Sequence, residues 1–455
     1  MSTDLVIRGG RAVLAGRGVA EVDLGVTDGR IVELADPGRL TAHETVDARG
    51  LLVLPGAIDM HVHFRQPGFE HKEDFAHGTA AAACGGVTTV CDMPNTDPPV
   101  VDVDRFITKR NLVQDQAHVD FALWAGGTDL DQLPRMEAAG AIGLKVYMNR
   151  SYRADDPYSD QLAIRDLDAL RDVLVSSTRL GWPVSVHACD HATEAGVRAG
   201  LRARSRTDAR LVCRAYRGEG ALGGLRQVIT LLRETGAAGH IAHVSLAPIE
   251  ALDLIGAARG EGVRITCECG PPALHEDELE HLGVHGVPFA FPPAEAETYW
   301  AAIADGRVDC VATDHAPHSR ADKEAGRDDV WRAPPGYPGV ETSLPLMLDA
   351  ALRERLSLSR LAAVAGETPA RILGLAAKGR IAVGCDADLV LADPESDTTI
   401  DEQRLHSKAG WSPFHGRRLR GRLVATYLRG GPVAEDGDLV GSRPRGRFLT
   451  RRPAQ

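Results

Sequence analysis

Short apolar runs recur through the middle of the chain, and this recurrence restricts the fold more than any other feature. Amphipathic stretches with helical periodicity, at residues 160–177 and 220–236, lie between some of the runs. Strands that alternate with helices favour parallel βα units, and eight such strands predict an α/β protein with a (β/α)8 TIM barrel. The eight runs are 57–63, 87–94, 119–127, 141–148, 183–188, 240–246, 263–270 and 308–317.

The two ends of the chain have a different character. Short apolar stretches, such as LLVLPG at 51–56 and ADLVLADP at 387–394, are separated there by glycine and aspartate. This pattern is typical of β-structure with tight turns. We therefore expect the barrel to occupy residues 55–374, and residues 1–54 and 375–455 to form a second, β-rich domain.

The charge balance limits the classes of partner. The 455 residues include 52 basic and 63 acidic side chains, a net charge of −11. Binding to nucleic acid or to a membrane surface needs a basic face, so neither is expected, and the arginine-rich tail is interpreted as solvated. The N-terminus lacks a signal-peptide pattern, and no apolar run could span a bilayer. Eight scattered cysteines indicate a reduced, cytoplasmic setting.

Side chains that bind metals recur where the predicted strands end. His61 and His63 close the first strand, and their spacing puts both rings on one face because side chains alternate along a strand. Singly, each residue has an ordinary explanation: a histidine is commonly a hydrogen-bonded core group, Lys145 an ion-paired lysine, and Asp314 a helix N-cap. Together, at the strand ends that line barrel active sites, they suit Zn²⁺ or a similar ion. The set comprises His61, His63, Lys145, His187, His243 and Asp314.

Several motifs together resemble the dihydroorotase family of the amidohydrolase superfamily. They are DMHVHFRQPG from residue 59, GLKVYMN from 143, SVHA from 185, IAHVS from 241, TDHAPH from 313 and PPGYPGVETSLPLML from 334. The GLKVYMNRSY segment is most similar to the dihydroorotase domain of the animal multifunctional pyrimidine protein. The resemblance covers nearly the whole chain, and it implies that both termini build a small β-sandwich.

The resemblance also implies a two-metal centre. In that family the lysine matching Lys145 is carboxylated by CO₂, and its carbamate bridges two Zn²⁺ or similar ions. Carboxylation needs an uncharged amine, which burial favours. Asp314 would take a proton from the attacking water and pass it to the leaving nitrogen. The first ion would be held by His61, His63, Lys145 and Asp314, and the second by Lys145, His187 and His243.

Glu268, in the TCE segment at 266–268, has two alternative roles. In the animal domain the matching glutamate helps a first-strand histidine to hold a third zinc. A carboxylate that hydrogen-bonds a ligand histidine is the commoner arrangement, and we favour this role for Glu268.

Contacts to the substrate follow from the same resemblance. Arg65 follows His63 on the same face, where a guanidinium suits a bidentate grip on a carboxylate; a structural salt bridge is the alternative. Ser151 and Tyr152 match a mobile loop that closes over the ring, although Tyr152 also suits an aromatic packed on the rim. The remaining matching contacts are Asn95, His318, Pro335 and Gly336.

Two segments depart from the dihydroorotase pattern. Where the family carries histidines, residues 270–274 read Gly-Pro-Pro-Ala-Leu, and residues 290–296 lack the usual arginine. Either His275 fills the vacated space or the space stays apolar, and we favour the first outcome.

Three functions remain open at this point. The leading one is a dihydroorotase that interconverts N-carbamoyl-L-aspartate and L-dihydroorotate in pyrimidine biosynthesis, which Arg65 and Asn95 favour. The second is a hydantoinase- or allantoinase-like amidohydrolase for another acidic cyclic amide or ureide, which the altered segments favour. The third is a non-catalytic scaffold for aspartate transcarbamoylase, which the complete ligand set disfavours. We expect a small-molecule substrate and a homo-oligomer, with aspartate transcarbamoylase as a candidate contact.

Overall fold

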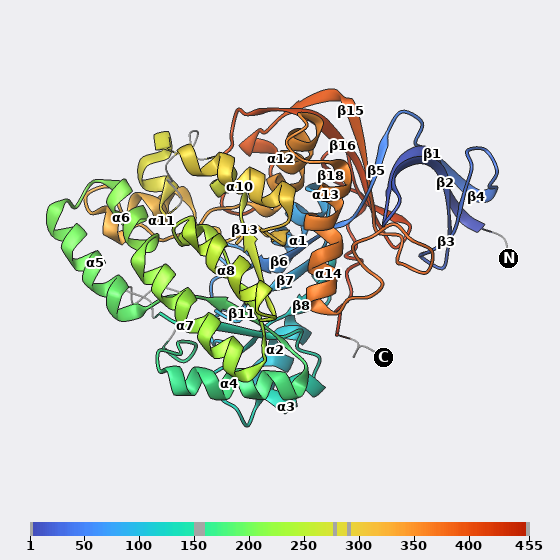
Figure 1. Cartoon of the computed structure of the whole chain (residues 1–455). Coiled ribbons are helices and arrows are strands. Elements are labelled where there is room, and N and C mark those ends of the chain that lie inside the picture. Colours follow the sequence, from blue (N-terminus) through green and yellow to red (C-terminus); the bar gives the residue numbers. More distant parts are fainter. Residues whose placement is uncertain (1–2, 150–159, 276–279, 289–292, 452–455) are drawn as a thin grey trace.

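Eight parallel strands form a barrel at the centre of the protein (Figure 1). The computed structural model describes residues 3–149, 160–275, 280–288 and 293–451. The barrel strands are β6 (Ala57–Val62), β7 (Val87–Asp92), β8 (Asp120–Leu123) with β9 (Ala125–Gly126), β10 (Leu144–Tyr147), β11 (Pro183–His187), β12 (Ala238–Ile241), β13 (Ile265–Cys269) and β14 (Cys310–Val311). β8 and β9 act as one strand, because β8 pairs with β7 while β9 pairs with β10. The TIM-barrel prediction is therefore confirmed.

The barrel closes where its first and last strands meet. Val62 and His315 form a parallel bridge, and the amide of His63 donates to the carbonyl of His315 at 2.7 Å. The carboxylate of Asp59 accepts from the hydroxyl of Thr313 at 2.5 Å and from its amide at 3.2 Å. Residues more than 250 positions apart in the sequence are thereby held side by side.

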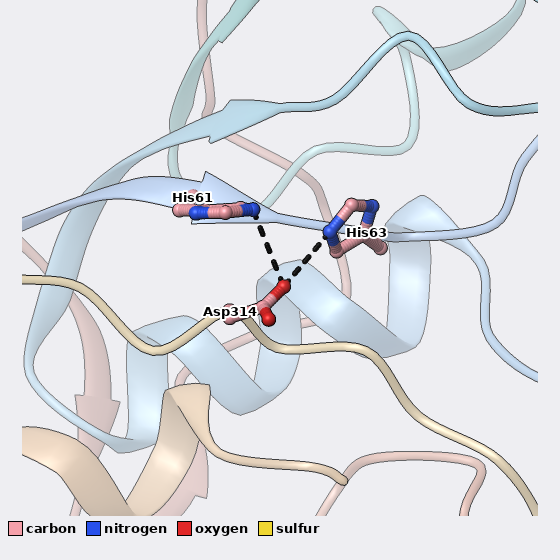
Figure 2. A group of neighbouring side chains, drawn as sticks. All are labelled: His61, His63 and Asp314. Carbon is pink, nitrogen blue, oxygen red and sulfur yellow. Dashed lines mark hydrogen bonds and ion pairs between the residues drawn. The ribbon is translucent and has the colours of Figure 1, made fainter. Parts of the chain in front are cut away.

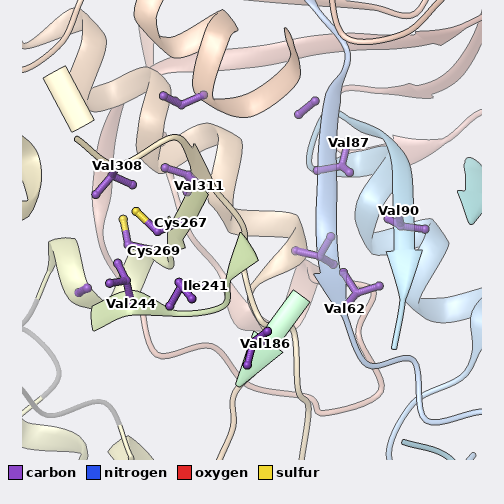
Figure 3. Close-up of a cluster of buried hydrophobic side chains, with 14 of the residues drawn as sticks. Val62, Val87, Val90, Val186, Ile241, Val244, Cys267, Cys269, Val308 and Val311 are labelled. Atoms are coloured by element: carbon purple, nitrogen blue, oxygen red, sulfur yellow. The ribbon is translucent and has the colours of Figure 1, made fainter. Parts of the chain in front are cut away.

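Branched aliphatic side chains explain why these runs form buried strands. Val62, Val90, Val186 and Ile241 are all at most 3% exposed, and Figure 3 shows such side chains gathered from several of the barrel strands. β-Branched residues pack well on a pleated surface. A strand that is buried on both faces reads as a continuous apolar run, which is the pattern that the sequence shows.

Helices surround the barrel in the order expected of βα units. Among the described residues, none of them combines the length and apolar character needed to cross a membrane. The helices are α1 (Phe75–Cys84), α2 (Val103–Val113), α3 (Leu133–Ala138), α4 (Leu167–Leu180), α5 (His191–Arg204), α6 (Ala209–Tyr216), α7 (Glu219–Thr235), α8 (Glu250–Gly260), α10 (Pro293–Asp305), α11 (Arg320–Glu324), α12 (Val340–Leu352), α13 (Leu358–Ala362) and α14 (Thr368–Leu373).

Two predicted elements have different limits in the structure. The helix expected at 160–177 begins only at Leu167, because the side chain of Asp166 caps it by accepting from the amide of Ala169. The run at 308–317 forms only the short β14. The chain then turns into a loop in which Asp314 adopts a left-handed φ of 49°, so polar residues of the predicted strand lie beyond it.

Strands from both ends of the chain build the second domain, a β-sandwich whose sheet runs in the order β18-β17-β16-β15-β5-β1-β2-β3, with β4 against β1. In Figure 1 the blue N-terminal and red C-terminal strands lie together. The domain limits at 54/55 and 374/375 stay a prediction. The strands are β1 (Thr3–Leu14), β2 (Gly18–Thr27), β3 (Arg30–Ala35), β4 (Ala42–Asp47), β5 (Leu52–Pro55), β15 (Leu389–Thr399), β16 (Arg418–Leu428), β17 (Gly431–Glu435) and β18 (Asp438–Leu439).

A buried lysine joins the barrel to this sheet. The ammonium of Lys378, 4% exposed, lies 2.6 Å from a carboxylate oxygen of Asp120 on β8 and 2.6 Å from one of Asp388. It also lies 2.9 Å from Asp386. Asp388 directly precedes β15, and it also accepts from the amide of Arg429 at 2.8 Å. One cation therefore compensates carboxylates from both parts of the protein.

We expect Lys378→Met to destabilise the protein by about 3–5 kcal/mol, because it leaves the buried carboxylate of Asp388 without its cation. Thermal and denaturant unfolding would measure the change. The matched control is Arg418→Ala, which removes an exposed pair with Asp397 and is expected to cost less than about 1 kcal/mol. Equal losses in the two variants would contradict this role of Lys378.

Candidate active site

Two histidines from β6 meet one carboxylate from the loop after β14. Nε2 of His61 lies 3.2 Å from Oδ1 of Asp314, and Nε2 of His63 lies 2.9 Å from the same oxygen. Figure 2 shows both rings directed at this carboxylate. The i, i+2 spacing thus places both histidines on one face, as the strand geometry predicts.

Hydrogen bonds on the far side of each ring fix its tautomer. Nδ1 of His61 lies 2.5 Å from Oε1 of Glu268, and Nδ1 of His63 lies 2.7 Å from Oδ1 of Asn95. Both partners are acceptors, so each Nδ1 carries a proton, and each Nε2 is the ring nitrogen that would bind an ion beside Asp314. Carboxylates and carbonyls commonly orient metal-binding imidazoles in this way.

The other predicted ligands lie beside this group. Nζ of Lys145 is 3.5 Å from Nε2 of His61, and Nδ1 of His187 is 2.9 Å from Nε2 of His243. The rings of His61 and His243 are 5.6 Å apart between centroids. The structure therefore brings all six predicted metal ligands into one cluster at the ends of β6, β10, β11, β12 and β14.

Burial determines the protonation of this cluster. It lowers the pKa of Lys145 to about 8, that of His63 to about 3 and that of His243 to about 4. It also lowers the pKa of His187 well below the ordinary value. Desolvation acts this way because it penalises the charged form of a base. His63, His187 and His243 are therefore neutral near pH 7, as metal ligands must be.

The donor set fits a divalent cation. Burial raises the pKa of Asp314, but His61 and His63 outweigh it and hold this pKa below the ordinary range. Two imidazoles and an ionised carboxylate thus converge, with ligand atoms within 4.8 Å of one another. Imidazole nitrogen together with carboxylate oxygen suits zinc.

Backbone strain concentrates in the same place. Arg65, His243 and Asp314 have φ values of 63°, 35° and 49°, in the left-handed region that non-glycine residues rarely adopt. Strain of this kind persists where the surrounding structure enforces it, and it clusters at functional sites.

The predicted substrate residues form a second buried group. Nε2 of His318 lies 3.3 Å from the guanidinium of Arg65 and 3.1 Å from the carbonyl of Pro335. The ammonium of Lys323, fully buried, donates to the carbonyl of Gly336 at 3.0 Å and to that of Pro334 at 2.8 Å. Lys323 thus fixes the loop beside His318. Ser151 and Tyr152 lie outside the described residues.

Asn95 is placed as expected of a substrate contact, whereas His275 is not. Oδ1 of Asn95 is used by His63, while its Nδ2 is buried without a hydrogen-bond partner, so a donor remains for a substrate. The ring of His275 packs 5.8 Å from that of Trp300 and 5.7 Å from that of Phe414. Among the described residues, no hydrogen bond or ring contact joins His275 to the metal ligands, and the replacement of the missing histidine by His275 has no support.

Glu268 has the geometry of a supporting carboxylate. Its Oε1 holds His61, and its Oε2 lies 2.9 Å from Nε2 of His240. Both oxygens therefore already hold histidines, and the third-metal role, in which Glu268 would share an ion with a first-strand histidine, stays the less favoured alternative.

Sequence reasoning missed three residues around the site: Asp59, His240 and Lys323. Asp59 was open to detection, since it lies two residues before His61 on the same strand face. His240 acts through Glu268 on the neighbouring strand, and Lys323 acts through carbonyls from two loops. Neither role has a signal in the local sequence.

The barrel with its cluster of imidazole and carboxylate ligands defines a hydrolase of the metal-dependent class. The sequence profile of the amidohydrolase family matches residues 52–412. The chain belongs to the amidohydrolase family.

Similar proteins carry three different activity names. An allantoinase of Rubrobacter xylanophilus is 38% identical, over 98% of this chain and 97% of its own. A dihydroorotase of Halobacterium salinarum is 40% identical, over 94% and 96%. The structure of an L-hydantoinase from Arthrobacter aurescens is 31% identical and superimposes with a TM-score of 0.92, over 99% of this chain and 100% of its own.

These similarities confirm a hydrolase of cyclic amides within the predicted superfamily. They do not confirm the narrower prediction of a dihydroorotase, because allantoinases and a hydantoinase are comparably similar. Pyrimidine biosynthesis is likewise not confirmed as the context.

We expect Glu268→Gln to reduce metal affinity by about 10- to 100-fold, as is usual when a carboxylate that supports a ligand histidine is lost. Metal titration of the stripped protein would measure it. Glu250→Gln, the same change at an exposed position in α8, is the control. Unchanged metal affinity in Glu268→Gln, or a zinc-edge anomalous peak beside Glu268 in the parent, would contradict the supporting role.

Proposed function

We propose that the protein hydrolyses a cyclic ureide of the allantoin or hydantoin class, with two divalent metal ions at the six-residue cluster. The convergence of two buried imidazoles, those of His61 and His63, on Asp314 is the observation that carries this proposal. The ligands would be divided as the family resemblance implies, with a CO₂-derived carbamate on Lys145 shared between the ions. Two such ions supply an activated water and polarise the scissile carbonyl.

The chain's own residues have separate tasks in this reaction. Asp314, at the mouth of the cluster, is placed to accept a proton from the attacking water and return it to the leaving nitrogen. Lys145, with a pKa of about 8, has an appreciable fraction of neutral amine near neutral pH, which reaction with CO₂ requires. Arg65, 3% exposed, offers a charged donor to an oxygen of the ring.

The loop after β13 departs from the dihydroorotase pattern, and this supports a cyclic ureide other than dihydroorotate. Pro271, Pro272, Ala273 and Leu274 are all buried, and His275 packs against aromatic side chains away from the metal ligands. The polar contact that dihydroorotases make on this side is therefore missing. The names of several relatives, allantoinase and L-hydantoinase, agree with this choice.

Dihydroorotate is the second candidate. It is favoured by the buried Arg65 beside His318, an arrangement suited to a carboxylate, and by the dihydroorotase relatives. The scaffold hypothesis has no support, since these relatives are named as enzymes, and neither an oligomer nor a transcarbamoylase contact is supported.

We expect a higher kcat/KM for allantoin or hydantoin than for L-dihydroorotate, because the apolar wall at 271–274 lacks the polar contact that dihydroorotases make to their own substrate, and a polar group left unpaired costs about 1–3 kcal/mol. Steady-state assays of the metal-loaded protein with each ring, and with N-carbamoyl-L-aspartate for closure, would measure this. A preference for dihydroorotate would select the second candidate instead.

We also expect Lys145→Ala to lose most activity, at least about 100-fold, because it removes the ligand shared by both ions. Short carboxylic acids added to the assay should restore part of the rate by replacing the carbamate. Lys408→Ala, at a surface lysine that pairs with Asp74, is the control. Full activity in Lys145→Ala, or equal losses in both variants, would contradict the two-metal mechanism.

A further inference from the structure

Three backbone carbonyls from two loops converge on one buried ammonium. Nζ of Lys323 donates to the carbonyl of Val287 at 2.7 Å. It also donates to the carbonyls of Pro334 at 2.8 Å and Gly336 at 3.0 Å. The lysine is 0% exposed, and a buried charge is tolerated where hydrogen bonds satisfy it. The loops at 287 and at 334–336 are therefore joined through one cation.

The ammonium keeps these carbonyls together. Carbonyl oxygens carry partial negative charge, and oxygens directed at one point repel one another most strongly in a protein interior, where the dielectric constant is low. A buried acceptor that loses its donor is also costly. Without the ammonium, the loops would separate or would admit another cation between them.

Lys323 follows His318 by five residues, on the short helix α11. The helix begins directly after Ser319, whose hydroxyl accepts from the amide of Asp322 at 3.1 Å. The carboxylate of Asp322 in turn accepts from the amide of Ser319 at 3.0 Å. This capping box fixes the first turn, so the turn sets where the ammonium lies relative to His318.

Contacts lead from this cation to the predicted substrate residues. Pro335 lies between two of the carbonyls that Lys323 holds, and its own carbonyl oxygen is 3.1 Å from Nε2 of His318. The same nitrogen is 3.3 Å from the guanidinium of Arg65. The backbone of His318 is fixed separately, because its carbonyl accepts from the indole of Trp411 at 2.8 Å. The orientation of the imidazole, rather than the path of its backbone, therefore depends on Pro335.

The opposite side of the 334–336 loop is held without Lys323. The carbonyl of Tyr337 accepts from the amide of Ala316 at 3.0 Å, and His315 forms a parallel bridge with Tyr337. These contacts hold the segment that directly follows Asp314. Loss of the ammonium is therefore expected to disturb the substrate side of the site and to leave the metal ligands in place.

We propose that Lys323 is a positioning residue for substrate binding. Its ammonium holds the carbonyl of Pro335 where it orients the ring of His318, and that ring positions the guanidinium of Arg65. This inference rests on the proposed hydrolysis of a cyclic ureide, in which Arg65 meets an oxygen of the ring. It makes the three carbonyls a cation site of the fold, filled by a side chain rather than by an ion.

Lys323→Ala with an added amine tests the cation site. The substitution removes a propylammonium-sized part of the side chain. In the metal-loaded variant, KM for hydantoin or allantoin should rise at least about tenfold, the effect of one hydrogen bond to a charged group. Its kcat and metal content should stay within about threefold of the parent, as expected when only binding is affected. Propylammonium chloride should restore KM, whereas tetramethylammonium chloride, which has no N–H, should not. An unchanged KM, or no response to propylammonium, would overturn the proposal.

Two further variants separate the cation from the packing. Lys323→Met fills the same space with an apolar chain, so KM should rise as in Lys323→Ala, but propylammonium should have no effect. This variant also decides the proposal if Lys323→Ala does not fold, since a parental KM in Lys323→Met would contradict it. Arg327→Ala removes an exposed cation just after α11, one that pairs with Glu324, and should leave KM unchanged.

A double-mutant cycle shows whether Lys323 acts through His318. Substitutions of residues that act through one another are not additive. In a His318→Ala background, Lys323→Ala should therefore change KM by less than about twofold, although it raises KM about tenfold in the parent. Equal effects in the two backgrounds would mean that Lys323 stabilises the fold without positioning the ring, and would overturn the proposal.

Failure of the proposed function has a different signature, namely no turnover of any cyclic ureide by the metal-loaded parent. Calorimetric binding of L-dihydroorotate to the same variants then decides the inference, since its carboxylate would also meet Arg65. Weaker binding to Lys323→Ala, restored by propylammonium, would support the positioning role. Equal binding to parent and variant, or no binding to the parent, would overturn it.

Discussion

Closure of the barrel between β6 and β14 is the interaction on which the rest of the site depends. The bridge from Val62 to His315 and the hydrogen bond from His63 to the same residue set the distance between the histidine pair and Asp314. Asp59 reinforces this join, because its carboxylate accepts from Thr313 and from the amide of His61. A shift of this seam would separate the histidine pair from Asp314 and so divide the donor set.

The metal centre is consequently assembled from positions that have little freedom. His61, Lys145 and His187 lie on strands whose neighbours fix them on both sides. Glu268 then couples two of the strands, because its two oxygens hold His61 on β6 and His240 on β12. The side chains are thus oriented before any ion binds, which reduces the ordering that binding must accomplish.

The metal centre could be predicted from the sequence because its signals are local and periodic. Apolar runs locate the strands, and a polar residue at the end of a run locates each ligand. The helix at α4 begins late and β14 is short because a side-chain cap at Asp166 and a left-handed residue at Asp314 override the run of apolar residues. Those features depend on single backbone conformations rather than on periodicity.

The substrate side was harder to predict for a physical reason. Nothing in the sequence around His275 shows that its ring packs against Trp300 and Phe414. Lys323 lies in a short helix, five residues after His318. Their surroundings come from distant segments, so only the folded chain reveals them. The family motif could suggest contacts such as Arg65 but could not show which polar atoms remain without a partner.

This division between strands and loops also explains how one architecture serves several ring substrates. Proteins named allantoinase, dihydroorotase and L-hydantoinase align with nearly the whole of this chain, so their differences in specificity do not require a different fold. In this protein the ligands lie on the barrel strands or just beyond their ends, whereas the apolar wall at 271–274 and the loop fixed by Lys323 lie on connecting segments. Loops tolerate substitution better than the strands they join, so a pocket can change its preferred substituent while the hydrolytic centre keeps its geometry.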